Sequence, residues 1–141
     1  VTPAVTAIRE ALTSARATSG PIAVVGHAKL ATALGEHREV IPVGLSARAS
    51  KKLAGKVADD TRASDSKALD AVIGIDIATD EGWEATLRAW SALVRDGGVI
   101  VFVDRNHAAE ASRRALCAGL TELEQRHAGR SVITSGLVTQ L

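Results

Sequence analysis

Aromatic residues and cysteine are scarce in this sequence. Its 141 residues include two tryptophans, one phenylalanine and no tyrosine, and Cys117 is the single cysteine. One cysteine excludes a disulfide within the chain and is typical of a reducing compartment, so we expect a cytoplasmic protein. So few aromatic side chains argue against a surface on which nucleic acid bases stack.

Excess charge and long apolar runs are also missing. Seventeen basic and 16 acidic residues leave a net charge of +1, which gives no overall attraction to nucleic acid or anionic lipid. No apolar run approaches the roughly 20 residues that cross a bilayer, and no signal peptide pattern precedes the first predicted helix. The four histidines show no metal-ligand spacing. We therefore expect no membrane, nucleic acid or metal among the ligands.

Apolar runs and helical periodicity alternate along the chain. Short runs rich in β-branched residues are typical of parallel strands covered on both faces, and they occur at residues 21–26, 39–45, 68–78 and 99–104. Periodicity and capping residues predict helices at residues 3–19, 28–35, 47–55, 81–96 and 107–118. Pro42 cannot donate to a strand ladder, which predicts that its strand lies at an edge or beside an irregular neighbour.

The order of these elements predicts the fold class. Residues 56–66 are polar and predicted to be a loop, and the last two runs, 120–129 and 130–141, predict an antiparallel hairpin. The length is that of one domain over residues 1–141. We expect an α/β fold with a doubly wound, mostly parallel sheet, helices on both faces and a C-terminal antiparallel β-hairpin.

Local signals predict how two of the later helices begin and pack. Asp80 is predicted to cap the helix over residues 81–96, with Arg95 in its last turn. Asn106 is predicted to cap the next helix, and Cys117 near its end is predicted to be a small core residue. The sheet-facing stripe of the first of these helices is expected to contain Trp83, Leu87, Trp90 and Val94.

Four segments resemble the class I S-adenosylmethionine-dependent methyltransferases. They are AVVG (23–26), VGLS (43–46), LDAVIGID (69–76) and LVRDGGVIVFVD (93–104). The last segment, followed by the predicted hairpin, carries most of the resemblance, which covers nearly the whole chain. A receiver or flavodoxin-like domain also alternates strands and helices, but it does not normally end in two antiparallel strands.

The resemblance implies S-adenosylmethionine as the cofactor and places it at the turn after residues 23–26. Family members have an acid in the first strand, a Gly-X-Gly-X-Gly loop, and an acid that ends the second strand. These positions correspond here to Val24, then Gly26, Ala28 and Leu30, and then Gly44. Each missing charge-assisted hydrogen bond is worth roughly 1.5–3 kcal/mol, so the site is predicted to be degenerate.

Other residues are candidates for the same site. His27 lies in the turn, and Asp59 or Asp60 matches the family's adenine-binding acid, although a pair of aspartates in a polar loop is more often simply solvated. Asp76 lies where some family members place a catalytic or substrate-binding acid, or else it serves as a cap. The implied cofactor-binding set is Gly26, His27, Ala28, Gly44, Asp59 and Asp76. Residues 104–106 follow a predicted strand at the edge where open α/β sheets bind ligands.

Two functions remain open. The missing acids and glycines favour a noncatalytic protein-interaction or regulatory module with a methyltransferase fold. The alternative is an active S-adenosylmethionine-dependent methyltransferase that acts on a small molecule. One predicted helix face is basic and consists of Arg48, Lys51, Lys52 and Lys56. It is either simply solvated, or it docks an acidic protein partner or a phosphate.

Overall fold

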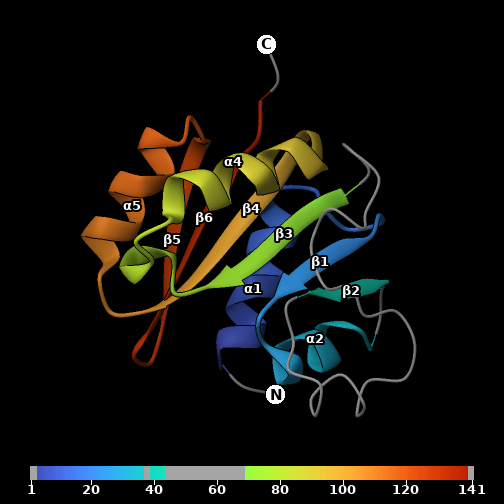
Figure 1. Ribbon diagram of the computed structural model, residues 1–141. Coiled ribbons are helices and arrows are strands. Elements are labelled where there is room, and N and C mark those ends of the chain that lie inside the picture. The colour runs from blue at the N-terminus through green and yellow to red at the C-terminus, as the bar shows by residue number, and fades with distance from the viewer. Residues whose placement is uncertain (1–2, 37–38, 44–68, 140–141) are drawn as a thin grey trace.

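The computed structural model describes residues 3–36, 39–43 and 69–139. Within them, six strands form one sheet in the order β2-β1-β3-β4-β6-β5 (Figure 1). β1 to β4 run parallel, and β6 runs antiparallel to both β4 and β5. The strands are β1 (Ile22–Val25), β2 (Val40–Val43), β3 (Leu69–Ile75), β4 (Val94–Arg105), β5 (Thr121–Ala128) and β6 (Ser131–Leu137). The predicted mostly parallel sheet with a C-terminal hairpin is confirmed.

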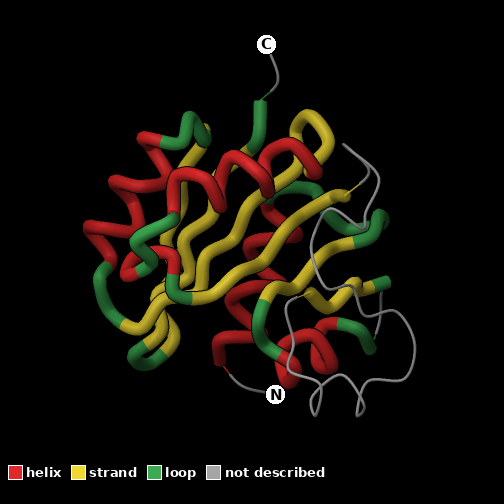
Figure 2. The backbone as a smooth tube through the Cα atoms, viewed as in Figure 1, coloured by secondary structure: helices red, strands yellow, loops and turns green. Residues whose placement is uncertain are grey.

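Helices cover both faces of the sheet (Figure 2). They are α1 (Pro3–Ser14), α2 (Ala28–Leu34), the 3₁₀ turn η2 (Ile77–Thr79), α4 (Trp83–Leu93) and α5 (Ala108–Cys117). The core has two parts: α1 and α2 pack in one cluster with Ile73, whereas η2, α4 and α5 pack in the other with Val72. Neighbouring residues of β3 thus point to opposite faces, and both faces are apolar because both are covered.

β2 lies at the edge of the sheet that the described residues form, as Pro42 predicted. Pro42 pairs in register with Val24 of β1. The predicted helix at 47–55 and loop at 56–66 lie outside the described residues. No helix within the described ranges is long and apolar enough to span a membrane.

The predicted boundaries of the helix at 81–96 are wrong at both ends. Its N-cap is Gly82, and Asp80 instead accepts a hydrogen bond from the Gly82 N–H at 3.1 Å. Val94 and Arg95 belong to β4, where Val94 is fully buried and pairs with Leu69. Strand pairing with β3 therefore replaces the last helical turn, which the sequence periodicity does not reveal.

The start of β4 is held by a buried carboxylate. Asp70 in β3 accepts hydrogen bonds from Arg95 Nε at 2.7 Å and from the Gly20 N–H at 2.6 Å. Its exposed fraction is 6%, so the two donors compensate a charge that has lost most of its water. Arg95 therefore links β4 to β3 through Asp70 and does not lie in the last turn of a helix.

Two expectations for α5 are also wrong. His107 is the N-cap residue in place of Asn106, and its side chain makes no capping hydrogen bond. Cys117 is exposed, because the buried side of α5 is formed by Ala111 and Ala115. Cys117 therefore lies on the outer side of the helix, next to Leu116, whose exposed fraction is 66%.

Candidate functional site

The turns after β1, β3 and β4 meet at one edge of the sheet, because these strands are parallel and in register (Figure 1). Asp76 directly follows β3, and its N–H donates to the Val103 carbonyl of β4 at 2.9 Å. Asp104 lies one residue beyond Val103. Ligands of open α/β sheets bind at this carboxyl edge, which makes these turns the candidate functional site.

The turn between β1 and α2, Gly26 and His27, is built from local contacts. Gly26 has φ +75°, a conformation that favours glycine, and a side chain added there would meet nothing closer than Ile75 at 3.9 Å. His27 is extended and caps α2, with its Nδ1 accepting the Leu30 N–H at 3.0 Å. The glycine therefore serves the turn from strand into helix, and the imidazole satisfies one of the helix's free N–H groups.

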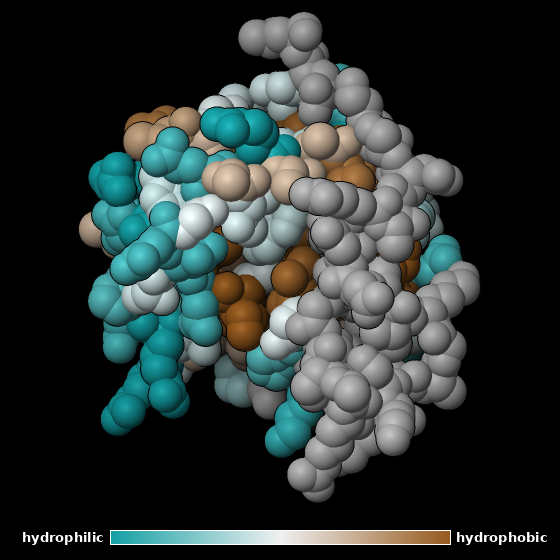
Figure 3. All heavy atoms as spheres, viewed as in Figure 1, coloured by the Kyte–Doolittle hydropathy of each residue, from teal (hydrophilic) through white to brown (hydrophobic). Residues whose placement is uncertain are grey.

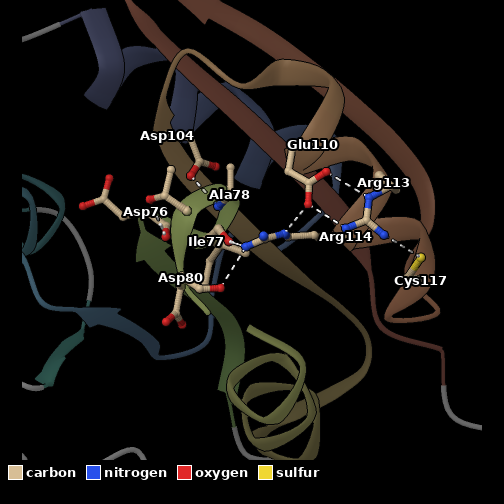
Figure 4. Close-up of polar contacts among 10 residues, drawn as sticks. Asp76, Ile77, Ala78, Asp80, Asp104, Glu110, Arg113, Arg114 and Cys117 are labelled. Atoms are coloured by element: carbon tan, nitrogen blue, oxygen red, sulfur yellow. Dashed lines mark hydrogen bonds and ion pairs between the residues drawn. The ribbon is translucent and has the colours of Figure 1, made fainter. Parts of the chain in front are cut away.

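The turn after β3, residues 76–80, is held by side chains that are distant in sequence (Figure 4). Asp104 Oδ1 accepts the Ala78 N–H at 2.8 Å. From the other side, Arg114 donates to the carbonyl of Ile77 and, at 2.9 Å, to that of Asp80. We call this arrangement the η2 clamp, since β4 and α5 hold the η2 turn between them.

Asp76 is displayed by this clamp. It has φ +59°, in the left-handed region that few residues other than glycine adopt, and its side chain is exposed. In Figure 4 its carboxylate points away from the two arginines of α5. An exposed carboxylate on a fixed, strained backbone is suited to accept hydrogen bonds from a ligand.

Asp104 is the buried acid of the site, with an exposed fraction of 3%. Its second oxygen, Oδ2, has no hydrogen-bond partner among the described residues. Burial raises the pKa of this carboxyl above its ordinary value, and the nearby Asp76 raises it further, while the Ala78 N–H, His107 and Arg114 oppose the shift. Asp104 thus has one oxygen committed to the fold and one uncommitted.

Glu110 orients the cation of the clamp. Arg113 Nη2 and Arg114 Nε each lie 2.6 Å from Glu110 Oε2. Hydrogen bonds from Arg113 and Arg114 lower the Glu110 pKa from 4.5 to about 2, so the carboxylate stays charged across the physiological range. The same contact raises the pKa of Arg113. The clamp arginine is therefore anchored by a permanent ion pair.

The residues expected at the site divide into two groups. Gly26, His27 and Asp76 lie in the turns of the carboxyl edge, and Ala28 is the first residue of α2. Gly44, Asp59 and the basic face formed by Arg48, Lys51, Lys52 and Lys56 lie outside the described residues. Within the described ranges, no three His, Cys, Asp or Glu side chains are grouped to hold a metal ion.

The sequence reasoning missed Arg114. Its spacing of four from Glu110 was a visible signal for an ion pair on one helix face. Its contacts with Ile77 and Asp80 were not visible, because they cross 37 and 34 positions of sequence.

Comparison with known proteins finds similar structures but no matching family model and no curated protein of similar sequence. Several solved structures match, all at low identity. The chain resembles a chain of the complex between the Haloferax volcanii Trm112 methyltransferase activator and the protein assigned as its methyltransferase. That match has a TM-score of 0.74 and 13% identity, and it covers 95% of this chain and 89% of that one.

Two further matches agree on the fold. A protein from Methanococcus maripaludis assigned as an S-adenosyl-L-methionine-dependent methyltransferase gives a TM-score of 0.73 at 11% identity, over 97% of this chain and 85% of that chain. The T. thermophilus 16S rRNA N2 G1207 methyltransferase, in complex with AdoMet and guanosine, gives 0.65 at 15% identity. This match covers 86% of the present chain but spans only 36% of the rRNA enzyme. The chain therefore has the class I S-adenosylmethionine-dependent methyltransferase fold.

Proposed function

We propose that this protein is a noncatalytic member of the methyltransferase fold that works by binding another protein. The observation that carries the proposal is the β1–α2 turn, where the His27 imidazole takes the Leu30 N–H. The resemblance places the cofactor at this turn. The Leu30 N–H is therefore already bonded within the protein and is not free to bind a cofactor.

The side chains around this turn support the same proposal. At the position that corresponds to the family's first-strand acid, Val24 is fully buried in the apolar cluster beneath α1 and α2. The position that corresponds to the ribose-binding acid is Gly44, which has no side chain. The donor and acceptor set of these positions does not fit S-adenosylmethionine, and the losses together correspond to several powers of ten in affinity.

The proposed partner is a protein. A structurally similar chain comes from a complex with a protein activator, so assembly of this fold with another protein has a precedent. The basic face is the part of the sequence that we assign to such a contact. Changing Arg48, Lys51, Lys52 and Lys56 to Glu should remove an acidic partner from a pull-down; retention of every partner by this variant would contradict the assignment.

An active enzyme is the second candidate, and a specific observation favours it. Asp76 follows β3 and Asp104 lies near the end of β4 at the same carboxyl edge, and Asp104 Oδ2 has no hydrogen-bond partner among the described residues. The exposed Asp76 offers an acceptor to a small substrate held beside a cofactor, whereas the buried Asp104 Oδ2 becomes available only if the neighbouring turn moves. For an active enzyme, the cofactor would have to approach the backbone at Gly26, which has no side chain in the way. The contacts made there would have to compensate for the missing acids.

Calorimetric titration with S-adenosylmethionine and S-adenosylhomocysteine separates the two candidates. We expect no heat of binding at millimolar ligand, with an intact-motif methyltransferase as the positive control under the same conditions. Submicromolar binding of either ligand would contradict the noncatalytic proposal. Mass spectrometry of the purified protein provides a second check, since a retained cofactor would give the same contradiction.

A further inference from the structure

A groove between α4 and α5 is separate from the turns described above. It encloses about 420 Å³, within the range of about 300–1,000 Å³ that is usual for small-molecule sites. Trp83, Arg88 and Ser91 line it from α4, and Arg113, Cys117 and Ala118 line it from α5. The sheet-facing positions of the same helices, such as Leu87 and Ala115, are buried, so the groove opens on the outer side of this layer.

The groove has more positive than negative charge. Arg113 and Arg114 share the single carboxylate of Glu110, so the three groups together keep one positive charge. Arg88 adds a guanidinium with no partner among the described residues, and Glu84 balances one of these charges. Figure 3 shows hydrophilic residues gathered over α5 and the neighbouring hairpin. Guanidinium groups on such a wall favour carboxylate or phosphate oxygens.

Arg113 has donors left for a ligand. Its Nε and Nη2 bond to the two Glu110 oxygens at 2.9 and 2.6 Å, and its Nη1 lies 3.9 Å from Cys117 Sγ. Because a guanidinium has five N–H donors, these contacts leave part of the fork unused. Glu110 holds the group in one orientation, which lowers the entropy cost of binding an anion there.

The groove also has an aromatic surface, the Trp83 indole of α4, which faces α5. The Trp83 indole is half-buried, and the guanidinium carbons of Arg113 and Arg114 lie 5.8 and 5.2 Å from its ring centroid. These cation–π contacts fix the ring against α5. Ala118 is small and leaves room beside it. The groove thus combines an ordered aromatic wall with guanidinium groups at its rim.

We propose that this groove binds a small planar anion, an aromatic ring that bears a carboxylate or phosphate group. The anionic group pairs with Arg88 and Arg113, and the ring lies along Trp83 and Ala118. The proposal does not depend on the function of the carboxyl edge, and its test is run without S-adenosylmethionine.

Cys117 is the reporter for the test, because it lines the groove and is the single cysteine of the chain. Phenyl phosphate is the probe, and methyl methanethiosulfonate is a neutral reagent that labels the thiol. In the wild type, millimolar phenyl phosphate should slow labelling several-fold, whereas benzyl alcohol and inorganic phosphate should slow it much less. Equal rates with and without phenyl phosphate would overturn the proposal, and so would equal protection by either control compound.

Two variants test the assigned contacts. Protection should be lost in Arg88→Gln, and also in Arg113→Gln, and should persist in Arg130→Gln, which changes an exposed arginine of the hairpin turn. Each rate is compared with and without probe in the same variant, since Arg113 itself contacts the thiol. Circular dichroism confirms that each variant is folded. Undiminished protection in both groove variants would overturn the assignment.

Discussion

The β1–α2 turn and the η2 turn lie at the same edge of the sheet but are held in different ways. In the first, Gly26 provides the backbone conformation and His27 bonds to a residue three positions away. In the second, Asp104 and Arg114 reach Ala78 and Ile77 from 26 and 37 positions away. Among the described residues, the long-range side-chain contacts of this edge hold the η2 turn, while those of the turn that the resemblance assigns to the cofactor are local.

The largest effect is expected when the clamp is removed by Arg114→Gln. The Arg114 side chain is 14% exposed and donates to two carbonyls and Glu110, so its loss should lower the unfolding free energy by about 2–3 kcal/mol. Chemical denaturation measures this value. Arg113→Gln is the matched control: it shares Glu110 but is 56% exposed, so it should stay close to wild type. Equal losses in the two variants would show that the η2 contacts contribute nothing.

A smaller loss is expected for Gly26→Ala. The added methyl group meets no close atom, so the cost comes from φ +75° alone and should be about 1–2 kcal/mol. Gly119→Ala is the comparison, because its φ of +84° carries the same conformational penalty and nothing lies within 4 Å of the added methyl group, so the two variants should lose similar amounts. Thermal denaturation of both variants gives the comparison. A neutral Gly26→Ala would mean that the glycine is present for a reason other than the turn.

His27→Ala removes the cap of α2 and should cost about 1 kcal/mol. His127→Ala, an exposed histidine of β5, is the control and should change the unfolding free energy very little. Amide hydrogen exchange at Leu30 provides a local readout, because its N–H loses its acceptor in the variant. An unchanged exchange rate at Leu30 would contradict the capping role.

The smallest effect, and the most specific in its pH dependence, is expected for Asp104→Asn. The folded-state pKa of Asp104 is raised above its ordinary value of 3.8, so its stabilising contribution is complete below that value and is lost as pH rises through the folded pKa. The Asn variant keeps an oxygen for the Ala78 N–H but cannot ionise. The unfolding free energy of the Asn variant should therefore not fall as the pH rises through the folded-state pKa of Asp104. Parallel pH profiles of the two proteins would exclude the raised pKa.

The same distinction between local and distant contacts explains how much could be predicted from the sequence. Within the described residues, the order of strands and helices and the C-terminal hairpin follow from local periodicity and turn chemistry, and they were predicted. Arg95 was assigned to a helix because the sequence does not show Asp70, its partner 25 positions away. Arg114 was missed for the same reason, and Cys117 was misplaced because one helical position decides between the core and solvent.

An NMR titration of the ¹⁵N-labelled protein with S-adenosylhomocysteine tests the central claim most directly. The amides of Gly26, Leu30 and Asp76 report on the two turns separately. If the β1–α2 turn has no cofactor function, none of these signals should shift in a saturable way up to millimolar ligand. Saturable shifts centred on Gly26 and Leu30 would contradict the account, because they would show that the turn binds the ligand in spite of its missing acids.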